Sequence, residues 1–203
     1  MTQPENKEAN KDWTGNSVAL LKTAGFANNS LTDRQSQDYY ATSPAAGKML
    51  LELDDFSNIW ECAAGEGHLA EVFREAGLLG KASDKYDRGY CEAIDFLTTG
   101  LSWDGDIVTN PPYKYGKEFI EKAMSILKDG RKLALFFPIR YLSSKSRRDI
   151  FEKYPPYKVW VSSSRLICAA NGEFDKVKGS AVDYAWFIWH KGYDGETKLG
   201  WFN

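Results

Sequence analysis

The sequence predicts an α/β protein built around a mostly parallel β-sheet. Short apolar runs typical of buried strands alternate with amphipathic segments of helical spacing through the middle of the chain. A glycine turn, Gly65-x-Gly67, separates the first predicted strand from the helix that follows it. Parallel neighbours need a crossover connection, so the alternation of strands and helices predicts βαβ units.

The first predicted helix begins at Ser43, where a serine N-cap is followed by proline at the first helical position. Apolar residues between Ala45 and Leu53 continue this helix as one face. The later helices show the same one-sided apolar pattern and end at glycine or proline. They are expected at 68–76, 118–127 and 143–154.

The predicted strands are short, apolar and bounded by turn residues. They are expected at 58–63, 81–83, 106–109, 132–137, 157–161 and 184–189. A polar loop over 162–183, and no helix, joins the last two, so these two strands are expected to pair antiparallel at one edge. Trp186 and Trp189 differ in parity and should point to opposite faces of the sheet.

Length and composition favour one globular domain. The chain has 203 residues, of which 43% are hydrophobic and 27% charged, and no apolar run approaches the length of a membrane helix. Residues 1–36 are polar and predict a loosely held arm, followed by a single domain over 37–203. Three cysteines without C-x-x-C spacing predict reduced thiols and a cytoplasmic protein. The net charge of −2 argues against coating nucleic acid by bulk charge but leaves a local basic groove open.

The glycine turn fits a nucleotide-binding pattern in form. Gly65-x-Gly67-x-x-Ala70 follows a strand and opens a helix, although a plain tight βα turn explains the same spacing. Asp84 ends the next strand, where a ribose-binding carboxylate belongs. Glu61 lies inside the end of the preceding strand, and because an unpaired buried carboxylate is costly, it should meet a cation or a donor. This acid suits a ligand with an ammonium group better than a nicotinamide pyrophosphate.

The run Asn110-Pro111-Pro112-Tyr113 is the most informative stretch of the chain. The two prolines fix φ and remove two backbone donors, and Asn110 before proline is held extended. Some carbonyls of this corner can then face outward as acceptors, beside the Asn110 amide and the Tyr113 ring. Two acceptors and a ring suit a flat heterocycle with an exocyclic amino group. A plain proline loop would require neither the asparagine nor the tyrosine.

Together these motifs resemble those of the DNA N6-adenine methyltransferases that depend on S-adenosylmethionine (SAM). The resemblance is to the short enzymes of this family found in phages and prophages. The resemblance covers roughly residues 38–201. It implies a Rossmann-like fold with helices on both faces of a twisted, mostly parallel seven-stranded sheet and an antiparallel C-terminal edge hairpin. It is carried by the motifs Y-Y-A-T-S-P, I-W-E-C-A-A-G-E-G-H-L, S-D-K-Y, D-F-L, T-N-P-P-Y and Y-A-W-F-I-W.

The resemblance also implies residue roles. Asp84 takes the ribose hydroxyls of SAM, Asp95 bonds its adenine amino group and Phe96 lines its ring. Glu61, Gly65 and Gly67 hold its methionine part, and Tyr40, Thr42 and Pro44 close over that end. Ala63 and Asn110 are the other cofactor positions that the resemblance implies. The catalytic residues implied are Asn110, Pro111, Pro112 and Tyr113, with acceptors at Asn110 and the Pro111 carbonyl and with Tyr113 stacked on the target base.

A separate target-recognition domain is not expected, so substrate specificity should come from short loops or from a homodimer. Two loops, 139–148 and 165–179, carry basic residues that could contact DNA phosphates, although a solvated helix face explains any one of them. These residues are Arg140, Lys145, Arg147, Arg148, Arg165, Lys176 and Lys178.

Other functions stay open at this point. The same corner would serve methylation of RNA adenine or of a protein glutamine amide, and a catalytically silent SAM- or DNA-binding phage protein would keep the fold. A nicotinamide dehydrogenase is a more distant alternative. His68 and His190 have no metal-ligand set around them in the sequence, so no metal and no membrane partner are expected.

Overall fold

The computed structural model describes residues 40–164, 166, 168–170 and 182–203, except the side chains of Tyr40 and Ala170. All of these residues belong to one compact unit, Gln35–Asn203. The arm predicted over 1–36 lies outside the described residues. Every helix in the described part of the chain is too short or too polar to cross a lipid bilayer.

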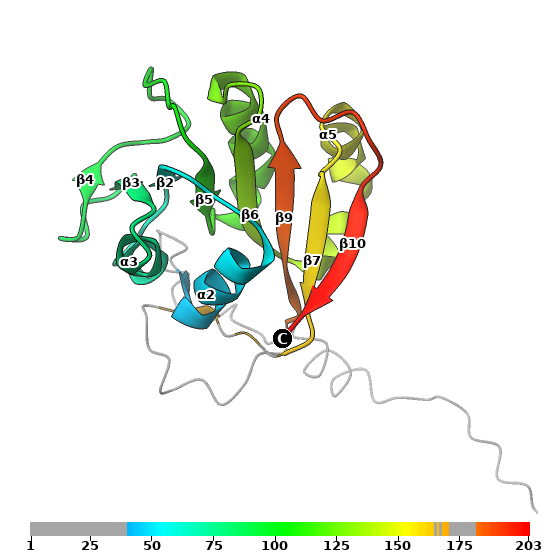
Figure 1. Ribbon diagram of the computed structural model, residues 1–203. Helices are drawn as coiled ribbons and strands as arrows, with labels where there is room; N and C mark the ends of the chain where they lie inside the picture. The colour runs from blue at the N-terminus through cyan, green and yellow to red at the C-terminus, as the bar shows by residue number, and fades with distance from the viewer. Residues whose placement is uncertain (1–39, 165, 167, 171–181) are drawn as a thin grey trace, which may run out of the picture. The chain divides into compact units, whose positions relative to one another are not determined.

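An eight-stranded mixed sheet forms the centre of this unit (Figure 1). In spatial order the strands are β4 (Glu92–Ala93), β3 (Leu79–Asp84), β2 (Ile59–Glu61), β5 (Ile107–Thr109), β6 (Lys132–Pro138), β9 (Tyr184–His190), β7 (Lys158–Ser162) and β10 (Lys198–Phe202). The strands β4, β3, β2, β5 and β6 are neighbours in this order and run parallel. Strand β9 runs antiparallel to both of its neighbours, and β10 runs parallel to β7.

The predicted fold class is confirmed, including the antiparallel pairing of β7 with β9. The expected number of strands and the expected edge differ from the structure, because the sheet has eight strands and β10 forms the edge beyond β7. Gly200 interrupts the apolar pattern of β10, and the structure explains this glycine. A Cβ at Gly200 would lie 2.1 Å from the ring of Trp160 on the neighbouring strand.

Helices cover both faces of the sheet. On one face lie α2 (Pro44–Leu53) and α3 (His68–Glu75), and on the other lie α4 (Gly116–Ile126) and α5 (Arg148–Lys153). Ser43 caps α2 as predicted, its side chain accepting a hydrogen bond from the Ala45 N–H. The helix expected over 143–154 begins only at Arg148. Two 3₁₀ turns, η2 (Ile139–Leu142) and η3 (Lys145–Arg147), precede it.

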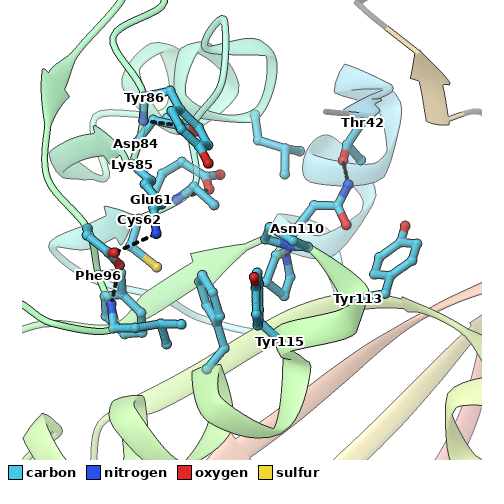
Figure 2. Close-up of a pocket in the computed structure, with 18 of the residues that line it drawn as sticks. Thr42, Glu61, Cys62, Asp84, Lys85, Tyr86, Phe96, Asn110, Tyr113 and Tyr115 are labelled. Atoms are coloured by element: carbon cyan, nitrogen blue, oxygen red, sulfur yellow. Dashed lines mark hydrogen bonds and ion pairs between the residues drawn. The ribbon is translucent and has the colours of Figure 1, made fainter. Parts of the chain in front are cut away.

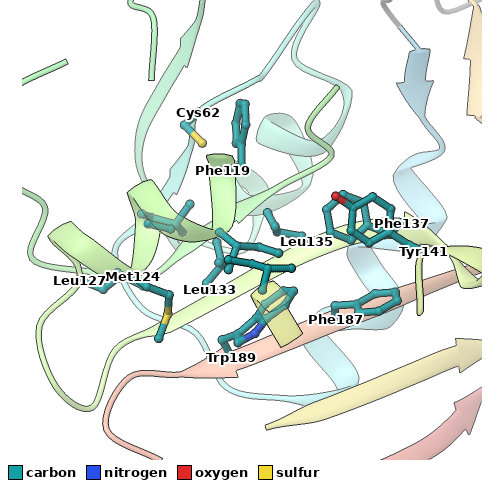
Figure 3. Packing of buried hydrophobic residues seen from close by; sticks show 14 of the residues in the cluster. Cys62, Phe119, Met124, Leu127, Leu133, Leu135, Phe137, Tyr141, Phe187 and Trp189 are labelled. Atoms are coloured by element: carbon teal, nitrogen blue, oxygen red, sulfur yellow. The ribbon is translucent and has the colours of Figure 1, made fainter. Parts of the chain in front are cut away.

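Two apolar cores result, one on each face. Figure 3 shows the core beneath α4 and α5, where Phe119 and Met124 pack on strand residues such as Leu133 and Trp189. Trp186 belongs to the other core, so the predicted opposite orientation of the two tryptophans is confirmed. Both tryptophans are fully buried. The indole N–H of Trp186 donates to the Ala46 carbonyl in α2, and that of Trp189 donates to the Tyr154 carbonyl directly after α5.

An ion cluster lies at the amino ends of β6 and β7. Lys132 begins β6, Lys158 begins β7, and both ammonium groups face Asp54 directly after α2. The distances from Nζ to the carboxylate are 2.6 Å for Lys132 and 3.8 Å for Lys158. This cluster therefore ties α2 to the sheet at the end opposite to the carboxyl ends of the parallel strands.

A second, two-stranded sheet pairs β1 (Tyr40–Thr42) antiparallel with β8 (Cys168–Ala170). The whole of 162–183 was expected as loop, so β8 corrects that prediction. Thr42 lies opposite Cys168 in the register of this pair.

Candidate functional site

A pocket of about 510 Å³ opens at the carboxyl ends of β2, β3 and β5 (Figure 2). Ligands of open α/β sheets bind at this end of the strands, because the loops that leave the strands converge there. The pocket brings together most of the residues predicted for the cofactor site and for the catalytic corner. Its predicted lining residues are Thr42, Glu61, Ala63, Asp84, Asp95, Phe96, Asn110, Pro111, Pro112 and Tyr113.

Glu61 is a buried acid at the end of β2, only 1% exposed. Its Oε1 atom accepts hydrogen bonds from the Thr109 hydroxyl and from the Ala63 N–H, whereas Oε2 is buried and has no hydrogen-bond partner among the described residues. Burial raises the pKa of Glu61 to about 8, although the bonds from Thr109 and Ala63 oppose the shift. The buried carboxyl therefore lacks a cationic partner among the described residues, and a cation bound beside Oε2 would lower its pKa again and stabilise its charged form.

Asp84 links β3 to the glycine turn. Its Oδ2 atom accepts from the Gly65 N–H at 2.8 Å, and Oδ1 accepts from the Tyr86 N–H at 2.9 Å. Gly65 and Gly67 both have positive φ, of 57° and 91°, which explains the two glycines of the turn. Each carboxylate oxygen has two lone pairs, so Asp84 keeps acceptor capacity for a ligand beyond these backbone bonds.

Asp95 lies on the same side of the pocket and forms an ion pair with Lys85, with 2.9 Å between Nζ and Oδ2. Burial raises the pKa of Asp95, but the Lys85 ammonium and the Leu97 N–H outweigh burial and hold it below its ordinary value. Asp95 is therefore ionised at neutral pH. Beside it, Phe96 is 2% exposed and packs edge-on against Trp60.

Asn110 follows β5 directly and lines the pocket together with Pro111 and Pro112. The Pro112 carbonyl accepts from the Tyr115 N–H and starts the short turn η1 (Tyr113–Tyr115). The Asn110 Nδ2 atom donates to Thr42 Oγ1 at 2.7 Å. The proline corner thus presents its asparagine side chain beside the strand ends that carry the acids.

The tyrosine rings near the Asn110–Tyr113 corner lie in two places, one facing β8 and the other in the exposed wall of the pocket. Tyr113 turns toward β8, where its hydroxyl lies 3.9 Å from the Cys168 sulfur, and its ring meets Phe137 edge-on. Tyr86 and Tyr115 also line the pocket and are 39% and 43% exposed (Figure 2). The pocket therefore offers exposed aromatic faces besides the predicted Tyr113.

Some expected site residues do not line the pocket wall themselves. Within the described structure, the pocket wall does not include Pro44, which begins α2, nor Gly65 and Gly67, which shape the turn. The backbone of Tyr40 belongs to β1, and its side chain lies outside the described residues.

The predicted basic residues are only partly described. Arg165, Lys176 and Lys178 lie outside the described residues. Arg140 and Lys145 are exposed on η2 and η3. Arg147 donates to the carbonyl of Tyr141, and Arg148 pairs with Glu152, so local contacts engage both guanidinium groups.

The sequence interpretation missed several lining residues. These missed residues closely follow predicted ones: Lys85, Tyr86 and Arg88 come after Asp84, and Lys114 and Tyr115 come after Tyr113. This neighbourhood in the sequence was the signal that could have identified them as lining residues. Among the described residues, no group of three or more histidine, cysteine, aspartate or glutamate side chains could hold a metal ion.

Comparison with known proteins gives fold-level similarity. No family model matches the chain, and no curated protein matches it. A Listeria monocytogenes structure described as a class I SAM-dependent methyltransferase superposes with a TM-score of 0.59 at 15% identity, over 91% of this chain and 70% of that one. A SAM-dependent O-methyltransferase of Thermotoga maritima gives 0.51 at 16% identity, over 75% and 66%.

A third similar structure, TehB of Haemophilus influenzae, gives a TM-score of 0.52 at 6% identity over 72% of this chain and 62% of that one. The chain therefore has the Rossmann-like fold seen in class I SAM-dependent methyltransferases.

Proposed function

We propose that this protein is a SAM-dependent methyltransferase that transfers a methyl group to the exocyclic N6 amine of adenine in DNA. One observation carries the proposal: a single pocket joins the acids at the ends of β2 and β3 with the Asn110–Tyr113 corner at the end of β5. A donor held by the acids and an amine held by the corner would then meet within one pocket.

The residues on the cofactor side fit SAM. The unsatisfied Oε2 of Glu61 suits the ammonium of its methionine part, and Asp84 suits the ribose hydroxyls. Asp95 and Phe96 suit the adenine amino group and ring. When bound, SAM supplies a methyl group made electrophilic by its sulfonium.

The Asn110–Tyr113 corner fits an aromatic amine. The lone pair of adenine N6 is delocalised into the ring, so the nitrogen is a poor nucleophile. Acceptors at Asn110 and at the Pro111 carbonyl would hold the two N–H groups and carry the positive charge that develops on nitrogen. Holding both reactants in one pocket supplies the remaining acceleration through positioning.

A base in duplex DNA would have to be flipped out to reach this pocket. Exposed rings of the kind found at Tyr86 and Tyr115 can stack on a base, which is worth about 1–3 kcal/mol. Lys114 is exposed at the same pocket and offers a cation to a phosphate. These features favour a nucleic-acid substrate over a protein amide.

The test uses purified full-length protein with methyl-labelled SAM and, separately, unmethylated DNA, RNA and a protein extract. We expect label in DNA, recovered after digestion as N6-methyladenine. Asn110→Ala should lower the rate about 100- to 1,000-fold, whereas the matched control Asn203→Ala, at an exposed position, should retain it. Label only in RNA or in protein would replace DNA by that substrate. SAM binding without any transfer would favour a silent binding protein.

A further inference from the structure

Thr42 contacts the proposed catalytic corner from a separate sheet. It ends β1, is 3% exposed, and its Oγ1 atom accepts the hydrogen bond from Asn110 Nδ2 at 2.7 Å (Figure 2). Sixty-eight residues separate the two positions in sequence, so the fold brings them together. The resemblance described above implies a place for Thr42 at the methionine end of the cofactor, and this contact points to a different role.

The direction of the Asn110 amide matters for the proposed chemistry. The amide has a donor end, Nδ2, and an acceptor end, Oδ1, and the two exchange on rotation by 180° about χ2. A target amine needs the acceptor end. An amide held through Nδ2 by Thr42 keeps Oδ1 on the side away from Thr42.

A threonine hydroxyl can donate as well as accept, so it selects one direction of the amide only if its own proton is engaged elsewhere. Cys168 lies opposite Thr42 in the β1–β8 pair. Hydrogen bonds from Tyr184, Tyr113 and Thr42 oppose the rise that burial causes in the pKa of the Cys168 thiol. A Thr42 hydroxyl whose proton is directed at this sulfur would offer only lone pairs to Asn110.

We propose that Thr42 is a positioning residue, which fixes the Asn110 amide with its acceptor end turned away from Thr42 and toward the target amine, and that Cys168 sets the direction of the Thr42 hydroxyl. This proposal rests on the proposed function. Through its pairing with β1, strand β8 would then influence the geometry of the reacting corner.

The test compares Thr42→Val, Thr42→Ser and Cys168→Ala in the full-length protein. Thr42→Val removes the hydroxyl at nearly constant shape and should lower kcat about tenfold without changing the Kd for SAM. Thr42→Ser should restore kcat to within about threefold. Cys168→Ala should give an intermediate loss, because the hydroxyl can then turn. Thr197→Val is the matched control. Thr197 directly precedes β10, and this change removes a threonine hydroxyl that donates to the Pro156 carbonyl.

A second readout needs no activity. In ¹⁵N-labelled protein, the side-chain amide resonances of Asn110, assigned by their loss in Asn110→Ala, should shift in Thr42→Val and return in Thr42→Ser. Resonances of both α-helical layers that stay unchanged would show that the variants fold.

Several results would overturn the proposal. Wild-type kcat in Thr42→Val, or a loss of SAM affinity with kcat retained at saturation, would return Thr42 to the cofactor site. Wild-type kcat in Cys168→Ala would overturn the part assigned to the cysteine. If wild-type protein methylates no nucleic acid, the proposed function fails, and unchanged Asn110 resonances in Thr42→Val would separately reject the positioning contact.

Discussion

Thr109 on β5 donates a hydrogen bond to Glu61 on the adjacent strand β2, and both side chains are buried at the carboxyl end of the sheet. The bond satisfies one oxygen of the carboxylate, whereas the other is buried in this pocket-lining residue without a partner among the described residues. This carboxyl therefore keeps one acceptor for a ligand, and its charge should govern both ligand binding and the response to pH.

Glu61→Gln should weaken SAM binding about 10- to 100-fold, because a charge-assisted hydrogen bond to an ammonium is replaced by a neutral one. Isothermal titration calorimetry measures the Kd. Glu52→Gln, at an exposed position on α2, is the matched control and should bind as wild type. Unchanged affinity in Glu61→Gln would remove Glu61 from the cofactor site.

Glu61 should also make the ligand-free protein less stable as pH rises. The pKa of this carboxyl is about 8 in the folded protein against an ordinary value of 4.5. Between these values the folded state binds more protons than the unfolded state, so the free energy of unfolding falls as pH rises. The stabilisation that the protonated Glu61 carboxyl contributes to the free energy of unfolding is complete below its pKa in the unfolded chain. It is lost as the pH rises through its pKa in the folded protein.

The effect of Glu61 on stability is measured as the difference in Tm between wild type and Glu61→Gln in thermal unfolding. From pH 5 to about pH 8, the Tm of wild type should fall relative to the Tm of Glu61→Gln, which has no titrating carboxyl there. A Tm difference independent of pH would mean that Glu61 titrates normally in the folded protein.

Lys85→Met should tighten SAM binding about two- to fivefold, because the ion pair with Asp95 competes with a ligand amino group for the same carboxylate. The pair is partly exposed, so the Tm should change little. Adding salt should weaken the Lys85–Asp95 ion pair, so the SAM affinity of wild type should approach that of Lys85→Met. Weaker binding in Lys85→Met would show instead that Lys85 contacts the ligand.

Gly67→Ala should destabilise the protein more than Gly77→Ala. Both glycines have positive φ, of 91° and 71°, so alanine is strained at either position. A Cβ at Gly67 would also lie 2.3 Å from the Tyr90 ring, whereas Gly77 has open space. We expect losses of about 2–3 kcal/mol and about 1 kcal/mol in urea denaturation.

Tyr90→Ala combined with Gly67→Ala tests the cause of the difference. Removing the ring should recover the excess loss and leave the backbone strain, which both glycine variants share. Equal losses in the two single variants would mean that Tyr90 swings aside freely.

Local signals carried the successful part of the sequence interpretation. Ser43 followed by Pro44 predicted the start of α2, because capping depends on neighbours in the chain. The Asn110–Tyr113 run and Glu61 were found in the same way, and the parallel topology then placed their strand ends in one pocket.

Contacts between distant segments were not predictable. The bond from Asn110 to Thr42 and the pairing of β1 with β8 join positions with no common periodicity. The ion pair of Lys85 with Asp95 depends on the path of the loop between β3 and β4. β10 was missed because Gly200, which the Trp160 ring requires, breaks the strand pattern.

The ion cluster of Asp54 with Lys132 and Lys158 lies at the opposite end of the strands from the pocket. Side chains there fasten α2 to β6 and β7 but line no part of the pocket within the described structure. Substitutions in this cluster should therefore change the stability of the fold while the lining of the pocket stays the same.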